Sequence, residues 1–173
     1  NIKTKRQGGS TFKPLLYTLG VMNGYTPETN MPGGPIDMGG KMIDGNGGPM
    51  AICLAFSKNP AAVHLINQLG VQRTIDFAKQ CGIVNEIPPY PSIALGSADL
   101  SLFEMVQAFS MFPGRGFNVK PNFISRIGDR NGNVLASFRA ETKEVISESE
   151  AFIMTKMLQG VVDFGTGRAL RGG

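Results

Sequence analysis

The stretch Arg6-Gln7-Gly8-Gly9-Ser10-Thr11-Phe12-Lys13-Pro14 sets a serine and a lysine three positions apart at the start of an apolar run. Residues at i and i+3 lie on the same face of a helix, so this spacing predicts that the hydroxyl of Ser10 and the amine of Lys13 meet. A serine hydroxyl is a good nucleophile only when a base within hydrogen-bonding reach takes its proton. We therefore interpret Ser10 as a candidate nucleophile and Lys13 as its candidate base.

A second polar motif, Ser57-Lys58-Asn59, follows another apolar run and begins 47 positions (57 − 10) after Ser10. Its hydroxyl and amide groups are the kind of polar groups that a serine and lysine pair needs nearby. The lysine between them is expected to be a solvated side chain, because alternate positions on a turn point apart. The motif therefore adds Ser57 and Asn59 to the candidate site.

These motifs and several further segments resemble the transpeptidase domain of class A penicillin-binding proteins, in which S-x-x-K precedes a second motif of the S-x-N type. The similar segments occur in the family's order along nearly the whole chain. They are residues 6–14, 24–29, 55–63, 91–96, 102–109 and 165–167.

The resemblance implies a serine acyl-enzyme, without cofactor or metal. Ser10 would attack the penultimate D-alanine carbonyl of a peptidoglycan stem peptide while Lys13 takes its proton. Ser57 would relay a proton between Lys13 and the leaving nitrogen, and Asn59 would bind the substrate carbonyl and help to fix Lys13. Penicillin and other β-lactams would acylate the same serine. The implied activity is that of a serine-type D,D-transpeptidase or D-Ala-D-Ala carboxypeptidase.

The chain departs from this family at three places. Gly8 stands where proline is usual, and a glycine-rich segment (residues 33–48) replaces a tryptophan-containing one and looks like a shortened or re-engineered loop. The third family motif, Lys-Thr/Ser-Gly, is absent, and we expect the chain to be truncated a few residues before it. Besides an active transpeptidase, a catalytically incomplete fragment and a β-lactam-sensing or β-lactamase-like module therefore remain open.

The expected fold class is α+β: the helix-rich part of the fold shared by penicillin-binding proteins and serine β-lactamases, with one β-hairpin and without much of the antiparallel sheet. We expect a single, partial domain over residues 1–173. Asn131-Gly132 is a typical hairpin turn, here between strands at 122–129 and 134–138. Ser147 and Glu150 form a capping-box pattern that opens the last helix. Helices are expected at 10–23, 50–57, 61–69, 73–81, 100–112 and 147–158, with a loop at 85–97.

Composition narrows the possible partners. Hydrophobic residues make up 42% and charged residues 17%, as is usual for a globular protein. The net charge is +4, but the basic residues are dispersed, so a nucleic-acid partner is not expected. Cys53 and Cys81 are expected to be buried free thiols. His64 is the single histidine, which argues against a Ser-His-Asp triad and a zinc site.

From the sequence we expect neither a signal peptide nor a membrane-spanning stretch within these residues. By resemblance, the parent protein would be anchored by an N-terminal membrane helix and would carry a glycosyltransferase domain before Asn1. This arrangement would place the domain in the bacterial periplasm or at the outer face of the cytoplasmic membrane.

Overall fold

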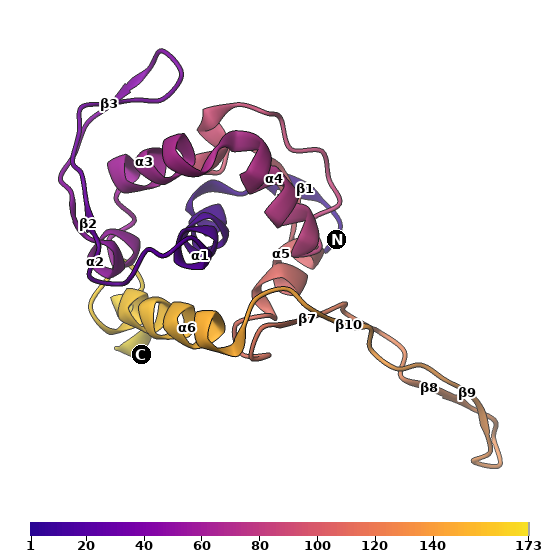
Figure 1. The fold of residues 1–173 in the computed structure, drawn as a ribbon. Helices are drawn as coiled ribbons and strands as arrows, with labels where there is room; N and C mark the ends of the chain where they lie inside the picture. Colours follow the sequence, from indigo (N-terminus) through magenta and orange to yellow (C-terminus); the bar gives the residue numbers. More distant parts are fainter. Residues whose placement is uncertain (173) are drawn as a thin grey trace.

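The computed structural model describes residues 1–172. The helices are α1 (Lys13–Met22), α2 (Met50–Ala55), α3 (Asn59–Leu69), α4 (Val71–Gln80), α5 (Leu102–Phe109) and α6 (Glu148–Asp163). Figure 1 shows α1 end-on at the centre, with the other five helices arranged around it. Nine of the ten residues of α1 are buried. Because a helix that is apolar on all sides is stable only inside a core, α1 determines where its neighbours pack.

The core forms where the apolar side chains of α1 meet α2, α3, α4 and α6. The largest side chains of α1 in this core are fully buried: Leu15, Leu16 and Tyr17 are each at most 1% exposed. The expected buried free thiols are confirmed, since Cys53 and Cys81 are both unpaired and inaccessible. His64 lies half-buried on α3, where burial lowers its pKa.

All six expected helices are present, but four of them start two or three residues from the expected position. One of these is α4, which begins at Val71 and not at Arg73. Ser10 was expected inside the first helix and instead lies in a 3₁₀ turn, η1 (Gly9–Phe12), which precedes α1. α3 begins at Asn59 because Pro60 fits the first turn of a helix, where its missing N–H is not needed. α5 begins only at Leu102, because Ser101 caps it and the three preceding residues form a strand.

The strands form five antiparallel ladders, and none in residues 1–172 has more than two strands. The expected hairpin is confirmed as β8 and β9, with a bulge near Gly128. It lies at the end of an arm that projects from the helices in Figure 1. The pairs are β1 (Lys5–Gln7) with β6 (Asp99–Ser101), β2 (Asn30–Met31) with β5 (Gly48–Pro49), β3 (Ile36–Asp37) with β4 (Met42–Ile43), β7 (Phe117–Val119) with β10 (Thr142–Glu144), and β8 (Arg126–Gly128) with β9 (Val134–Ser137).

No helix among residues 1–172 is both long enough and apolar enough to cross a membrane. No group of three or more histidine, cysteine, aspartate or glutamate side chains in this range is placed to hold a metal ion.

Glu104, in the first turn of α5, joins three segments of the fold although it is only 3% exposed. Its carboxylate accepts hydrogen bonds from the backbone N–H groups of Val84 and Asn85, at 2.9 and 2.7 Å. It also accepts from the N–H and the hydroxyl of Ser101, at 2.9 and 2.6 Å. Burial raises the pKa of this carboxyl, but the hydrogen bonds outweigh burial and the net pKa is lowered. The ionised form therefore holds β6, α5 and the loop after α4 together.

We expect Glu104→Gln to lower the free energy of unfolding by about 2–4 kcal/mol, because a hydrogen bond to a charged acceptor contributes about 1.5–3 kcal/mol and an amide nitrogen cannot accept one. Glu150→Gln is the matched control, since Glu150 forms the same capping box with Ser147, but its hydrogen bond to Ser147 is exposed to solvent. Its loss should stay below about 1 kcal/mol. Urea unfolding followed by circular dichroism measures both losses, and equal losses would contradict the role of Glu104.

The same pair of variants tests the pH dependence. The pKa of Glu104 is lowered in the fold, so its stabilisation is present above the ordinary pKa of glutamate and is lost as the pH falls through the lowered value. The difference in stability between wild type and Glu104→Gln should therefore shrink in acid. A difference that stays constant from neutral pH into acid would show that the carboxylate charge is not the cause.

Candidate active site

The candidate nucleophile Ser10 follows a short segment that is hydrogen-bonded to the loop after η2 (Pro91–Leu95). The backbone N–H of Gly8 donates to the carbonyl of Ala98 at 2.9 Å, and that of Gly9 donates to the carbonyl of Gly96 at 2.8 Å. Gly9 itself has a left-handed φ of 55°. These contacts turn the chain so that Ser10 is exposed directly before the buried helix α1.

Gly96 makes this contact possible. Its φ is +76°, a conformation that favours glycine, and a Cβ added there would overlap the carbonyl of Gly9. Gly96 lies in one of the segments that resemble the family, but it was not among the predicted site residues. Its contact with the residue before Ser10 depends on the approach of two distant segments, which a local pattern does not reveal.

Lys13, the first residue of α1, is 1% exposed and points its amine at the turn between α2 and α3. Its Nζ donates to the backbone carbonyl of Ser57 at 2.6 Å and to the Ser57 hydroxyl at 2.9 Å. It also donates to Oδ1 of Asn59 at 2.7 Å. An ammonium group has three protons, and these three acceptors can use all of them.

Burial lowers the pKa of Lys13 from its ordinary value of 10.5 to about 8. Removal of an ammonium from water disfavours its charged form, and among residues 1–172 no carboxylate forms an ion pair with Lys13 to offset this. With such a pKa, about a tenth of the molecules hold a neutral amine at pH 7. Lys13 can therefore both accept and return a proton near neutral pH.

Ser57 lies between Ser10 and Lys13, whose side chains were expected from the sequence to meet directly. Its Oγ lies 3.0 Å from Oγ of Ser10 and 2.9 Å from Nζ of Lys13. The amine of Lys13 is directed to Ser57 and Asn59, so the hydroxyl of Ser57 is the link to Ser10. Ser57 has a φ of 53°, a left-handed value that is costly for a residue other than glycine and that recurs at functional sites.

A cavity of about 270 Å³ opens beside this cluster. One wall comes from Thr166, in the Gly-Thr-Gly segment, whose backbone N–H donates to the carbonyl of Ala55 at 3.0 Å. Thr166 was not among the site residues predicted from the sequence. The lining residues are Ser10, Thr11, Lys13, Pro14, Leu54, Ser57, Phe109, Leu158, Val161 and Thr166.

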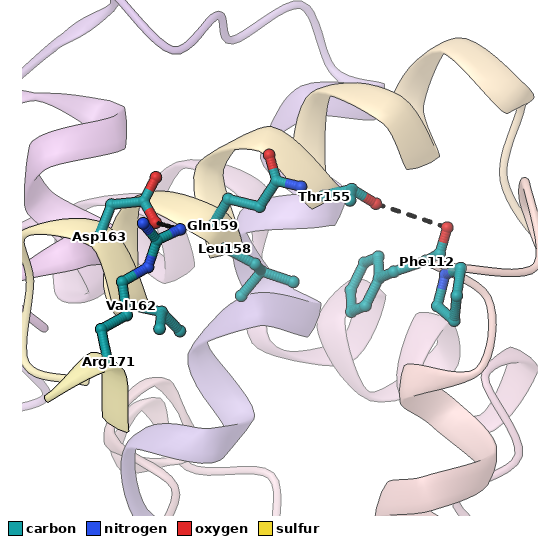
Figure 2. A pocket seen from close by; sticks show the side chains of 8 residues that line it. Phe112, Thr155, Leu158, Gln159, Val162, Asp163 and Arg171 are labelled. Atoms are coloured by element: carbon teal, nitrogen blue, oxygen red, sulfur yellow. Dashed lines mark hydrogen bonds and ion pairs between the residues drawn. The ribbon is translucent and has the colours of Figure 1, made fainter. Parts of the chain in front are cut away.

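A larger cavity, of about 410 Å³, lies along α6 and is lined by a largely different set of side chains (Figure 2). Leu158 and Val162 line it, the hydroxyl of Thr155 beside it donates to a backbone carbonyl, and Arg171 pairs with Asp163 at one end. None of its eight lining residues is Ser10, Lys13, Ser57 or Asn59, although Leu158 lines both cavities. The Ser10 cavity is therefore the candidate active site, although it is the smaller of the two.

Comparisons with known proteins agree over the whole chain. The family model described as the penicillin binding protein transpeptidase domain matches residues 1–172. Penicillin-binding protein 2D of Bacillus subtilis is 33% identical over 177 aligned residues, which cover 93% of this chain and 25% of that protein. The chain spans about a quarter of the length of the relatives that it matches first.

Solved structures resemble this chain more in shape than in sequence. The D,D-transpeptidase domain of a peptidoglycan glycosyltransferase from Eggerthella lenta matches with a TM-score of 0.84 and 18% identity, over 97% of this chain and 52% of that one. The penicillin G acyl-enzyme complex of penicillin-binding protein A from M. tuberculosis matches with a TM-score of 0.83 and 15% identity, over 94% of this chain and 45% of that one. These likenesses show the fold and confirm the expected fold class.

We expect one lysine of the chain to titrate near pH 8, and we assign it to Lys13. The pKa of its amine is lowered by burial, so the folded chain binds this proton less tightly than the unfolded chain does. The stability of the fold should consequently rise as the pH increases from about 8 towards 10.5. Lysine ε-carbon NMR spectra across this range measure the titration, and Lys13→Met should remove the resonance. If the resonance that Lys13→Met removes does not titrate near pH 8, the assignment is wrong.

We expect Gly96→Ala to cost more than about 3 kcal/mol of stability, the range in which a steric clash inside the fold falls. Gly132→Ala is the matched control, because Gly132 also has a positive φ, of +86°, but a Cβ there would meet nothing within 4 Å. It should cost only about 1 kcal/mol. Chemical unfolding compares the two variants, and similar losses would show that φ alone, without contact to Gly9, requires the glycine at position 96.

Proposed function

This chain belongs to the penicillin-binding protein transpeptidase family, and on that premise we propose that it is a serine-type peptidoglycan D,D-transpeptidase which β-lactams acylate at Ser10. The observation that carries the proposal is the hydrogen-bonded series from the buried amine of Lys13 through Ser57 to Ser10, at 2.9 and 3.0 Å. A buried amine with a pKa of about 8 is a suitable base near neutral pH, because it is already partly deprotonated.

In the first step, Oγ of Ser10 forms a bond to the carbonyl carbon of the penultimate D-alanine of a stem peptide. Its proton moves to Oγ of Ser57 as the Ser57 proton moves to the neutral amine of Lys13. The tetrahedral intermediate then breaks its C–N bond. The leaving nitrogen takes the proton back from Lys13 through Ser57, and the terminal D-alanine departs. Ser10 is left as an ester, which is the acyl-enzyme.

The second step repeats the first with a different nucleophile. An amine of a neighbouring stem peptide attacks the ester while Lys13 removes its proton, and Ser10 leaves with a proton as the cross-link forms. Attack by water instead would give carboxypeptidase activity. When the acylating group is a β-lactam, the ring C–N bond opens but the nitrogen stays attached to the acyl group. It therefore does not diffuse away, and the ester is released slowly.

Asn59 has two roles in this proposal. Its Oδ1 accepts from Nζ of Lys13 at 2.7 Å, which holds the amine toward Ser57. The NH2 of the same amide can donate to a substrate carbonyl, because an amide side chain offers both kinds of group. Asn59 is exposed at the N-terminal end of α3, where a bound peptide can reach it.

We propose further that residues 1–173 form part of a single transpeptidase domain; Gly173 lies outside the described residues. The parent protein would carry a glycosyltransferase domain and a membrane anchor before Asn1 and would act on peptidoglycan outside the cytoplasmic membrane. Two observations support this proposal: the chain spans a quarter of its relatives, and one structural neighbour is the D,D-transpeptidase domain of a peptidoglycan glycosyltransferase.

The decisive experiment is incubation of the purified chain with a fluorescent penicillin, followed by mass spectrometry. We expect a stable adduct on Ser10, absent from Ser10→Ala. Lys13→Ala and Ser57→Ala should each slow acylation by about two to four powers of ten, the range of general base catalysis. The wild-type rate should rise with pH through about 8, as Lys13 loses its proton. Rapid turnover would indicate a β-lactamase, and no adduct would indicate a catalytically incomplete chain or a purely structural one.

A further inference from the structure

Lys58 was expected from the sequence to be a solvated side chain. In the structure, its side chain does not extend freely into solvent. It is half-buried, and its Nζ donates to the backbone carbonyl of Gly47 at 2.6 Å. No carboxylate among residues 1–172 forms an ion pair with it. The partner of this cation is therefore a single backbone carbonyl, in a segment of the chain that lies outside the Ser57–Asn59 turn.

That segment is the glycine-rich strap, defined here as residues 30–49. Its residues 33–48 were interpreted from the sequence as a shortened or re-engineered loop. Its two ends pair as β2 and β5, with Met31 opposite Gly48, and its middle pairs as β3 and β4. Between these ladders, the N–H of Gly34 donates to the carbonyl of Gly45 at 2.7 Å. A Cβ at Gly47 would overlap the carbonyl of Met31. The glycines thus allow the two backbone runs of the strap to touch, and the strap is a folded ribbon.

Two successive carbonyls of the strap accept hydrogen bonds from residues on either side of Ser57. Gly47 accepts from Lys58, and Gly48 accepts from the thiol of Cys53, on α2, at 3.3 Å. Cys53 is buried, and its hydrogen bond to Gly48 is partly buried. The strap is consequently hydrogen-bonded to the chain both before Ser57, at Cys53, and after it, at Lys58.

Lys58 is also fixed through its backbone. Its N–H donates to the carbonyl of Cys53 at 2.8 Å, beside the bond from the N–H of Ser57 to the carbonyl of Leu54 at 3.0 Å. The peptide unit between Ser57 and Lys58 carries the carbonyl that accepts from Lys13 at 2.6 Å. With its N–H held by α2 and its side chain held by the strap, Lys58 leaves this peptide unit little rotational freedom.

Ser57 needs such support because its left-handed φ of 53° is intrinsically unfavourable, by about 1–3 kcal/mol. If the following peptide could rotate, Ser57 would relax towards an ordinary conformation. Its carbonyl would then turn away from Lys13, and its hydroxyl would move away from Ser10. Only a surrounding structure that restrains the turn keeps the three groups in line.

We infer that Lys58 is a positioning residue, which ties the glycine-rich strap to the Ser57–Asn59 turn and so keeps Ser57 between Ser10 and Lys13. This inference rests on the proposed function of the Ser10 site. It assigns Lys58 no contact with the substrate and no proton transfer. Its chemical contribution is one charge-assisted hydrogen bond to a backbone carbonyl, which an arginine could also make and a methionine could not.

The test compares Lys58→Met and Lys58→Arg with Lys41→Met, which removes an exposed lysine from the same strap. Two constants are measured with a fluorescent penicillin: the dissociation constant of the non-covalent complex and the first-order rate constant of acylation. We expect Lys58→Met to lower the rate constant by roughly tenfold to a hundredfold, the effect of a small misplacement of reacting groups. Its dissociation constant should change less than about twofold, a split that general destabilisation would not produce. Lys58→Arg should restore most of the rate, and Lys41→Met should match the wild type.

Amide hydrogen exchange gives a readout that does not require acylation. Lys58→Met should exchange faster than the wild type at the backbone N–H groups of Ser57 and Lys58, with the global unfolding temperature nearly unchanged. Wild-type acylation or wild-type exchange in Lys58→Met would each overturn the inference. If even the wild type forms no adduct on Ser10, the proposed function fails. Exchange alone then decides whether Lys58 holds the turn.

Discussion

The structure of the site depends on the burial of one amine. Lys13 is the first residue of a helix that is enclosed on all sides, so its side chain must find hydrogen-bond acceptors within the core. The turn between α2 and α3 supplies all three, through Ser57 and Asn59. The cost of removing a charge from water is thereby reduced without a counterion, and the same desolvation lowers the pKa of the amine. The burial that makes Lys13 need these acceptors therefore also leaves its amine partly deprotonated near neutral pH.

Several features around this amine are locally unfavourable. Ser57 has a left-handed φ, and Gly96 has no room for a side chain where it meets Gly9. Each feature persists because the surrounding packing determines it: the loop after η2 supports Ser10, and α2 with the glycine-rich strap supports Ser57. Concentration of strain and close backbone contact at one place is typical of a site that is arranged for chemistry.

The two halves of the site come from segments that are far apart in the chain but that pack on the same helix. Ser10 precedes α1 and Lys13 begins it. Ser57 lies in the turn after α2 and Asn59 begins α3, and both of these helices contact α1. Any movement of α1 relative to this helix pair would change the distance from Lys13 to Ser57. The apolar packing of α1 therefore maintains the geometry that the proposed proton transfer requires.

The sequence by itself determined what depends on local pattern. Ser10, Lys13, Ser57 and Asn59 were chosen from residue type and spacing, and the structure brings all four together. The capping box of Ser147 and Glu150 and the turn at Asn131-Gly132 were predicted, because their hydrogen bonds join residues a few positions apart. The number of helices followed from runs of apolar residues.

Only the tertiary structure decided how distant segments meet. That Ser57 separates Ser10 from Lys13 follows from where α1 docks, and the contact of Gly96 with Gly9 joins segments 87 positions (96 − 9) apart. The strap was interpreted as a loop, because glycine has no periodic pattern and its backbone pairing involves residues far along the chain. Lys58 was expected in solvent, because alternate positions on a turn point apart. Its acceptor is a backbone carbonyl, which carries no mark in the sequence. Contacts to backbone groups, and close approaches that require glycine, can be identified only in the folded chain.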